Sequence, residues 1–149
     1  MFDALLAVLV RAQVEFLVVG GVAVAQAGFA RFTEDIDLLV DGSPENVRRL
    51  IGALSTYGDG AAAELTPDDF PDEEGAVRLV DDVVVDLFTR MSGRTYADLA
   101  SSTVVSDRSG ARVLYLDADG LIALKSQSLR PKDRLDAEAL RAILRGETL

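Results

Sequence analysis

The sequence predicts an α/β domain in which helices flank a mixed β-sheet. Short apolar runs of strand length alternate along the chain with segments whose apolar residues recur at helical spacing. In the second half, two pairs of short strands each surround turn-forming residues, which is typical of hairpins and indicates a sheet that is not purely parallel. A chain of 149 residues can bury a substantial core, so we expect a single domain over residues 1–149.

The first half of the chain is expected to contain two strands among three helices. The apolar run at 16–19 predicts a short buried strand, and alternating apolar residues predict a second strand over 36–40. We expect a helix at 2–13 and an alanine-rich helix at 22–27. A third helix is expected to start at Ser43-Pro44 and to end near residue 55, because proline is favoured at the first helical position.

The second half is expected to add two hairpins and three helices. Segment 57–75 is rich in Gly, Asp, Glu and Pro and predicts a mobile loop. Strands at 77–80 and 83–88 flank a tight turn at Asp81-Asp82, and strands at 103–106 and 112–116 flank Ser109-Gly110. A short helix is expected at 95–100, and two longer ones at 117–129 and 131–144, separated at Arg130-Pro131.

The composition excludes several classes of chemistry. The chain has no cysteine and no histidine, so disulfides, Ser-His-Asp hydrolysis and histidine-bound zinc are all excluded. Any metal must be held by oxygen ligands, which favours Mg²⁺ or Mn²⁺. No apolar run is long enough for a membrane span, and the start Met1-Phe2-Asp3 lacks the basic residues of a signal peptide. We therefore expect a cytoplasmic protein with no membrane partner.

The charge is strongly acidic but unevenly distributed. A formal net charge of −10 argues against non-specific binding to nucleic acid, which needs clustered Lys and Arg. Residues 59–86 carry most of the acidic excess, whereas residues 125–145 are rich in Lys and Arg. A local basic surface for phosphate groups is therefore compatible with the overall balance.

The most informative motif joins a glycine pair to two closely spaced carboxylates. Gly20 and Gly21 follow the first predicted strand, where glycine permits positive φ and close approach by a phosphate group. Asp35 and Asp37 alternate with apolar residues, so a strand places both carboxylates on one face. Two like charges side by side on a sheet are costly unless a cation neutralises them. The motif predicts a divalent-metal site beside a phosphate-binding turn; the alternative is a tight turn followed by two edge aspartates.

These residues resemble the nucleotidyltransferase superfamily related to DNA polymerase beta. The string from Gly20 to Val40, GGVAVAQAGFARFTEDIDLLV, more specifically resembles bacterial minimal nucleotidyltransferases and the transferase toxins of abortive-infection toxin–antitoxin systems. The resemblance covers roughly residues 16–136 and implies the nucleotidyltransferase fold. It further implies that Asp35, Asp37 and a third carboxylate on a neighbouring strand hold Mg²⁺. Asp86, within 83–88, is the matching third carboxylate.

The resemblance also implies an activity and its partners. Such an enzyme moves a nucleoside monophosphate from an NTP, with ATP expected here, to a hydroxyl of RNA, protein or a small molecule. Gly20 and Gly21 would lie against the phosphates. A toxin–antitoxin setting would add a cognate antitoxin as partner. Four further residues match family segments and are predicted to contact the nucleotide: Arg31, Thr33, Lys125 and Asp133.

Each of these assignments has a structural alternative. Asp86 could be an edge-strand charge that discourages aggregation, and Lys125 a solvated lysine on a helix. Asp133 could favour the positive end of the helix that starts at Pro131, and we expect Asp136, three residues further along that helix, to be structural. Arg31 and Thr33 could brace the strand that follows them.

Other readings of the Asp-x-Asp pair fit less well. Phosphatases of the haloacid-dehalogenase type place their aspartate after an apolar strand, whereas here the apolar run follows the pair. The segment at 117–120 lacks the remaining ligands of a calcium loop. Metal-dependent glycosyltransferases do not explain the glycine pair and usually need a longer nucleotide-binding region. A rival of a different class is a non-catalytic module that keeps the transferase fold and acts by binding a protein.

Overall fold

A mixed six-stranded sheet forms the centre of the molecule, as the sequence predicts. The computed structural model describes residues 1–126 and 128–147. The strand order is β3-β4-β2-β1-β6-β5. The pairs β1–β6 and β2–β4 are parallel, whereas β1–β2, β3–β4 and β5–β6 are antiparallel. The strands are β1 (Phe16–Val19), β2 (Asp35–Val40), β3 (Val77–Val80), β4 (Val84–Phe88), β5 (Thr103–Arg108) and β6 (Ala111–Leu116).

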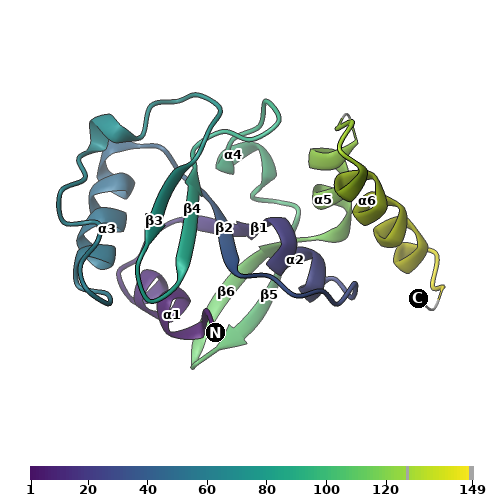
Figure 1. Ribbon diagram of the computed structural model, residues 1–149, viewed down its shortest axis with the longest axis horizontal. Coiled ribbons are helices and arrows are strands. Elements are labelled where there is room, and N and C mark those ends of the chain that lie inside the picture. The colour runs from purple at the N-terminus through teal and green to yellow at the C-terminus, as the bar shows by residue number, and fades with distance from the viewer. Residues whose placement is uncertain (127, 148–149) are drawn as a thin grey trace.

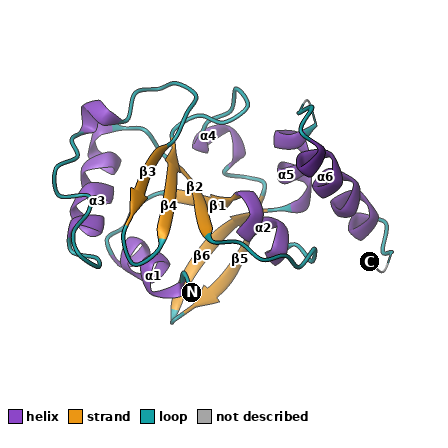
Figure 2. Cartoon of the chain, in the orientation of Figure 1, coloured by secondary structure: helices purple, strands orange, loops and turns teal. Residues whose placement is uncertain are grey.

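Helices lie at both ends of the sheet and on its faces (Figure 1). The helix α1 packs on β6 and α3, whereas α2 packs on β1 and β2 and also contacts α5. Figure 2 shows α5 and α6 together at one end of the molecule and α3 at the other. The helices are α1 (Asp3–Arg11), α2 (Gly20–Gln26), α3 (Pro44–Ser55), α4 (Tyr96–Leu99), α5 (Ala118–Lys125) and α6 (Pro131–Leu144), with a 3₁₀ turn at Pro67–Asp69.

The strand β1 lies in the middle of the sheet and is buried along its whole length. This position explains why residues 16–19 form an unbroken apolar run rather than an alternating one. The strand β2 lies beside it and buries Ile36 and Leu38 completely, while Asp35 and Asp37 point to the other face. The core therefore fixes both the position of β2 and the direction of its carboxylates.

Three expectations need correction. The helix predicted to reach residue 129 ends at Lys125. Residues 128–130 are not helical, in keeping with the extended backbone that a residue before proline favours. Segment 57–75 is irregular but packed, because Ala62 and Phe70 are buried and the Thr89 hydroxyl donates to the carbonyl of Pro71. The first hairpin has a longer connection than predicted: Val80 pairs with Val84 rather than with residue 83.

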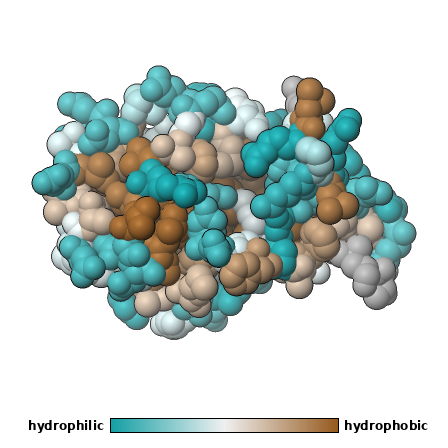
Figure 3. Space-filling view, viewed as in Figure 1, coloured by the Kyte–Doolittle hydropathy of each residue, from teal (hydrophilic) through white to brown (hydrophobic). Residues whose placement is uncertain are grey.

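The surface around α6 is mainly hydrophilic and is interrupted by apolar side chains (Figure 3). Leu135 and Leu144 of this helix are more than half exposed. Among the residues that the structure describes, no helix is both long enough and apolar enough to cross a bilayer.

A buried asparagine joins three elements near the end of β2. The Oδ1 of Asn46, on α3, accepts from the backbone N–H of Glu15 at 2.7 Å. Its Nδ2 donates to the carbonyls of Glu15 at 3.0 Å and Asp41 at 2.8 Å. Asn46 is 2% exposed, so water cannot replace these partners.

We expect Asn46→Ala to lower the free energy of unfolding by about 2–4 kcal/mol, because it leaves buried backbone groups unpaired. Urea unfolding followed by circular dichroism measures the change. Ser43→Ala serves as the control, since it removes the N-cap of the same helix and one exposed hydrogen bond to Asp41 and should cost about 1 kcal/mol. An equal loss in both variants would contradict the bridging role of Asn46.

Candidate active site

Three predicted carboxylates lie on one face of neighbouring strands. Asp37 of β2 is the direct parallel partner of Asp86 of β4, and Asp35 lies two residues before Asp37 on the same face. Asp86 is only 8% exposed. Val85 and Leu87, which flank it in sequence, point to the opposite face of the sheet and belong to the core. The alternation that the sequence predicts thus brings Asp86 beside the Asp35–Asp37 pair.

The glycine pair at the start of α2 lies directly against these residues. Gly20 has a φ of +66°, and a Cβ atom at this position would lie 2.1 Å from Oδ2 of Asp37. A Cβ on Gly21 would lie 2.8 Å from the Cγ2 of Thr33. Gly20 therefore needs glycine, because its φ is positive and a Cβ would overlap the side chain of Asp37, whereas a Cβ on Gly21 would have to displace the methyl group of Thr33.

Arg78 is part of this cluster and was not predicted. Its Nε and Nη2 donate to the two carboxylate oxygens of Asp86, each at 2.9 Å, and Nη2 also donates to Asp35 at 2.8 Å. Arg78 is the antiparallel partner of Asp86 across β3–β4. The predicted two-residue turn would have put Arg78 on the opposite face, since a one-residue shift of register reverses every side chain.

Asp37 is a carboxylate whose charged form is destabilised by its surroundings in the cluster. Burial, together with repulsion from Asp86 and Asp35, raises the pKa of Asp37 to about 6. Lys125 and Arg78 act in the opposite direction without cancelling the effect. The folded protein therefore holds a proton on Asp37 more tightly than the unfolded chain does.

The face beside the carboxylates is hollowed. A cavity of about 330 Å³ is lined by Gly21, Phe32, Thr33, Glu34, Asp35, Asp37 and Lys132. It gathers four of the predicted site residues and adds three that sequence reasoning missed: the 80% exposed Phe32, Glu34 and the lysine at the start of α6. Lys132 immediately precedes Asp133, which the resemblance to the family singles out, and this position was the signal that could have pointed to it.

A network of ion pairs connects α5 and α6 to the loop before β2. The Nζ of Lys125 lies 3.0 Å from Oδ1 of Asp133 and 3.2 Å from Oδ2 of Asp136. Asp136 also accepts a hydrogen bond from Arg31 and is 2% exposed. Arg31 is therefore held as a brace, which corresponds to the structural alternative given above, and its contact with phosphate stays a prediction. Asp136 is thus buried in ion pairs with Arg31 and Lys125, and its structural role stays a prediction.

Asp133 is held in its charged form by its neighbours. Burial would raise its pKa, but hydrogen bonds from Ser128 and Lys125 outweigh burial and keep the pKa below its ordinary value. The Ser128 hydroxyl donates at 2.7 Å. Asp133 also lines a second, larger groove of about 730 Å³ between residues 92–94 and the α5–α6 connection. Lys125 and Asp133 thus lie next to the carboxylate site rather than within the cavity at β2.

A separate acidic cluster lies at the β3–β4 turn. In the described part of the chain, Asp59, Asp81 and Asp82 are the three acidic residues that bring carboxylate oxygens within 4.8 Å of one another. Asp81 accepts from the backbone N–H groups of Asp59 and Ala61, and these hydrogen bonds lower its pKa. Its oxygens therefore already have partners, as expected for turn residues.

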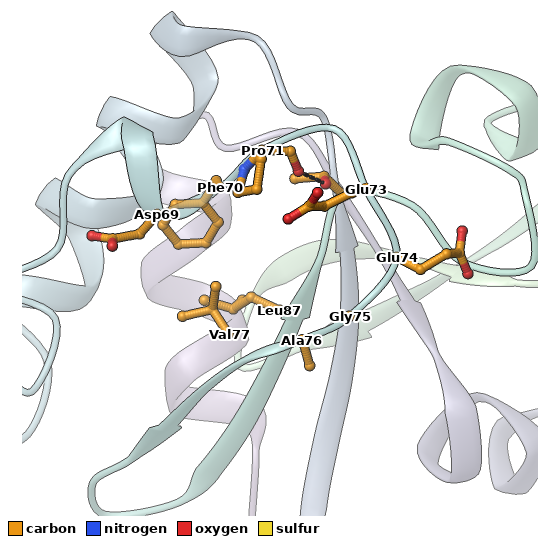
Figure 4. A pocket seen from close by; sticks show the side chains of 10 residues that line it. Asp69, Phe70, Pro71, Glu73, Glu74, Gly75, Ala76, Val77 and Leu87 are labelled. Carbon is orange, nitrogen blue, oxygen red and sulfur yellow. Dashed lines mark hydrogen bonds between the residues drawn. The ribbon is translucent and has the colours of Figure 1, made fainter.

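Another cavity lies on the opposite side of the β3–β4 hairpin. It has a volume of about 180 Å³ and is bounded by the segment 69–76 and by Val77, Leu87 and Thr89 (Figure 4). Val77 and Leu87 alternate with Arg78 and Asp86, so this cavity faces away from the carboxylates. It is not part of the candidate active site.

Comparison with known proteins assigns the family. Residues 2–145 match the DUF6036 family, described as nucleotidyltransferases of unknown function. The chain belongs to this family. Membership of DUF6036 confirms the predicted nucleotidyltransferase superfamily. A search among curated proteins finds no match.

Solved structures show the same fold for this DUF6036 chain. One is a candidate nucleotidyltransferase from Thermotoga maritima, with a TM-score of 0.56, 16% identity, and coverage of 98% of this chain and 94% of that one. Another is an antigenic nucleotidyltransferase-like protein from Paracoccidioides brasiliensis, with a TM-score of 0.55, 15% identity, and coverage of 97% and 75%. The predicted fold class is thereby confirmed.

The raised pKa of Asp37 predicts a pH-dependent stability. Its contribution to the free energy of unfolding is fully present below the ordinary pKa of 3.8 and is lost as the pH rises through about 6. In EDTA, Asp37→Asn should therefore be more stable than wild type near neutral pH and lose this advantage in acid. Urea unfolding of both proteins at about pH 4 and about pH 7 tests this. If the unfolding free energies of the two proteins change in parallel with pH, the pKa of Asp37 is not raised by folding.

The Asp136 network predicts a large stability loss. Asp136→Asn leaves Arg31, whose side chain is only 15% exposed, without its anionic partner, which should cost about 3–5 kcal/mol of unfolding free energy. Thermal and urea unfolding measure the loss. Glu45→Gln, which breaks the exposed pair with Arg49, is the matched control and should have a much smaller effect. Equal losses in both variants would refute the bracing role.

Proposed function

We propose that this protein is a metal-dependent nucleotidyltransferase that moves a nucleoside monophosphate from an NTP to a hydroxyl acceptor. The observation that carries the proposal is the direct pairing of Asp37 with Asp86 beside the Gly20 turn. Two carboxylates facing each other at this spacing weaken the sheet unless a cation neutralises them. Membership of a family of nucleotidyltransferases supports the assignment of the reaction.

The residues fit Mg²⁺ or Mn²⁺. Asp35, Asp37 and Asp86 offer hard oxygen donors, which these ions prefer, and the chain has no cysteine or histidine to compete. The raised pKa of Asp37 indicates a surplus of negative charge that a divalent cation would relieve. Asp35, Asp37 and Asp86 would hold the metal. When bound, such ions stabilise the attacking and leaving oxygens of an in-line displacement.

The chain's own residues would position the nucleotide and move a proton. Gly20 and Gly21 let the triphosphate approach the backbone beside Asp37. Thr33 lines the cavity next to Asp35 and Asp37. Lys125 would offset phosphate charge, with Asp133 holding its ammonium group in place. Asp86 would accept the proton of the acceptor hydroxyl. Arg31 would fix the loop that enters β2.

We propose ATP as the donor and a hydroxyl of RNA, protein or a small molecule as the acceptor. The resemblance of residues 20–40 to transferase toxins favours a bacterial toxin–antitoxin module, in which a cognate antitoxin would be the protein partner. The uneven charge described above supports a local phosphate-binding surface in an otherwise acidic protein.

The test is calorimetric titration of a non-hydrolysable ATP analogue with Mg²⁺ and, separately, with EDTA. Wild type should bind only with Mg²⁺, and Asp35→Asn and Asp37→Asn should lose both binding and nucleotidyl transfer while remaining folded. Asp72→Asn, which removes an exposed carboxylate paired with Arg90, is the matched control and should bind like wild type.

If the ATP analogue does not bind, analogues of the other nucleotides are titrated in the same way. Failure of analogues of all four nucleotides would reject the transferase and favour the rival interaction module, which needs neither metal nor nucleotide. Transfer activity that persists in Asp35→Asn or Asp37→Asn would reject the metal-binding role of these carboxylates.

A further inference from the structure

Arg78 occupies the space between two carboxylates that the proposed function assigns to a metal ion. Its guanidinium binds Asp86 through two parallel hydrogen bonds and reaches Asp35 with the same Nη2. Bidentate arginine–carboxylate pairs are among the strongest hydrogen-bonded contacts in proteins. The oxygens that would bind a divalent cation are therefore already bound to a monovalent one.

The sheet register fixes this arrangement. Arg78, Asp86 and Asp37 are successive partners across β3, β4 and β2, so their Cα atoms form one row. Asp86 is 11% exposed at its side chain, whereas Arg78 is 57% exposed. The carboxylate is held within the sheet, whereas the guanidinium lies at the end of a long side chain and can swing toward solvent once its hydrogen bonds to Asp86 and Asp35 are broken.

The carboxylates have not converged as a shared cation would require. Within residues 1–126 and 128–147, Asp35, Asp37 and Asp86 do not bring an oxygen each within 4.8 Å of one another, although the turn cluster of Asp59, Asp81 and Asp82 does. Two of the three carboxylates instead point at Arg78. A divalent ion bound by all three would need the oxygens that Arg78 now holds.

We propose that Arg78 is a built-in substitute for the metal, which a divalent cation displaces from Asp35 and Asp86 when it binds. This inference rests on the proposed function and adds a positioning residue to it. Arg78 balances the like charges while the site is metal-free and lowers the affinity for metal alone. Metal carried in with a triphosphate has additional ligands, so Arg78 makes metal and nucleotide bind jointly rather than separately.

Manganese binding by Arg78 variants tests the displacement. Mn²⁺ affinity is measured by electron paramagnetic resonance for wild type, Arg78→Gln and Arg78→Lys. Lysine keeps the charge but cannot bind Asp86 through two parallel hydrogen bonds. Both variants should bind Mn²⁺ more tightly than wild type, by about tenfold for glutamine and less for lysine, because the metal no longer competes with a charge-assisted pair.

A matched arginine serves as the control. Arg90 also binds one carboxylate through Nε and Nη2, that of Asp72, and it lies outside the proposed site. Arg90→Gln removes the same charge and the same kind of contact, so its Mn²⁺ affinity should equal that of wild type. If Arg78→Gln fails to fold without metal, Arg78→Lys still decides the question.

Four results would overturn the inference. If Arg78→Lys binds Mn²⁺ like wild type, Arg78 acts by charge alone and is not displaced. Weaker binding by either Arg78 variant would mean that Arg78 holds the ligands in place for the metal. If no protein of the set binds Mn²⁺, the proposed function fails as well, whereas Mn²⁺ binding by wild type with no gain in the variants rejects the inference alone.

Nuclear magnetic resonance gives a second readout that does not depend on a variant. The Nε–H of Arg78 should exchange slowly with water in EDTA, because Asp86 accepts it at 2.9 Å. Mg²⁺ added with the non-hydrolysable ATP analogue should remove this protection. Persistent protection in the loaded protein would show that Arg78 stays on Asp86 and would reject displacement.

Discussion

The pairing of Asp37 with Asp86 across two parallel strands is the constraint on which the rest of the site depends. The register that makes these residues neighbours is fixed by the apolar residues beside them in sequence. Ile36, next to Asp37, and Val85 and Leu87, on either side of Asp86, are buried on the other face of the sheet. The core thus forces two negative charges together. Around them the chain places compensating groups: Arg78 in direct contact, and Lys125 close enough to lower the pKa of Asp37.

Local pattern was sufficient to predict the carboxylate face and the glycine turn. Alternation over 35–40 determines which face Asp35 and Asp37 share, and a helix start packed against a strand requires residues without side chains. Asp86 was located instead by the resemblance to the family, which implies a third carboxylate on a neighbouring strand. These features depend on residues within one helix or strand, or on elements that follow one another in the predicted order along the chain.

The features that were missed depend on pairing between distant parts of the chain. The predicted turn at Asp81-Asp82 is one residue shorter than the real connection, and such a shift of register places Arg78 on the other face, away from Asp86. The bond between Arg31 and Asp136 joins residues 105 positions apart, and no local signal specifies it. Both misses concern charged residues whose partners are set by tertiary packing.

The strain at Asp37 has an evolutionary consequence. Under the proposed function, Asp37 costs folding stability in order to bind a cation, and such a position is maintained only while selection acts on that binding. Once selection is relaxed, a neutral side chain at residue 37 becomes immediately favourable, so a descendant that lost the proposed activity would gain stability. Family members that have become pure scaffolds should therefore carry their earliest replacements at this residue, whereas Gly20, whose backbone geometry is required by the fold itself, should persist long after the chemistry has gone.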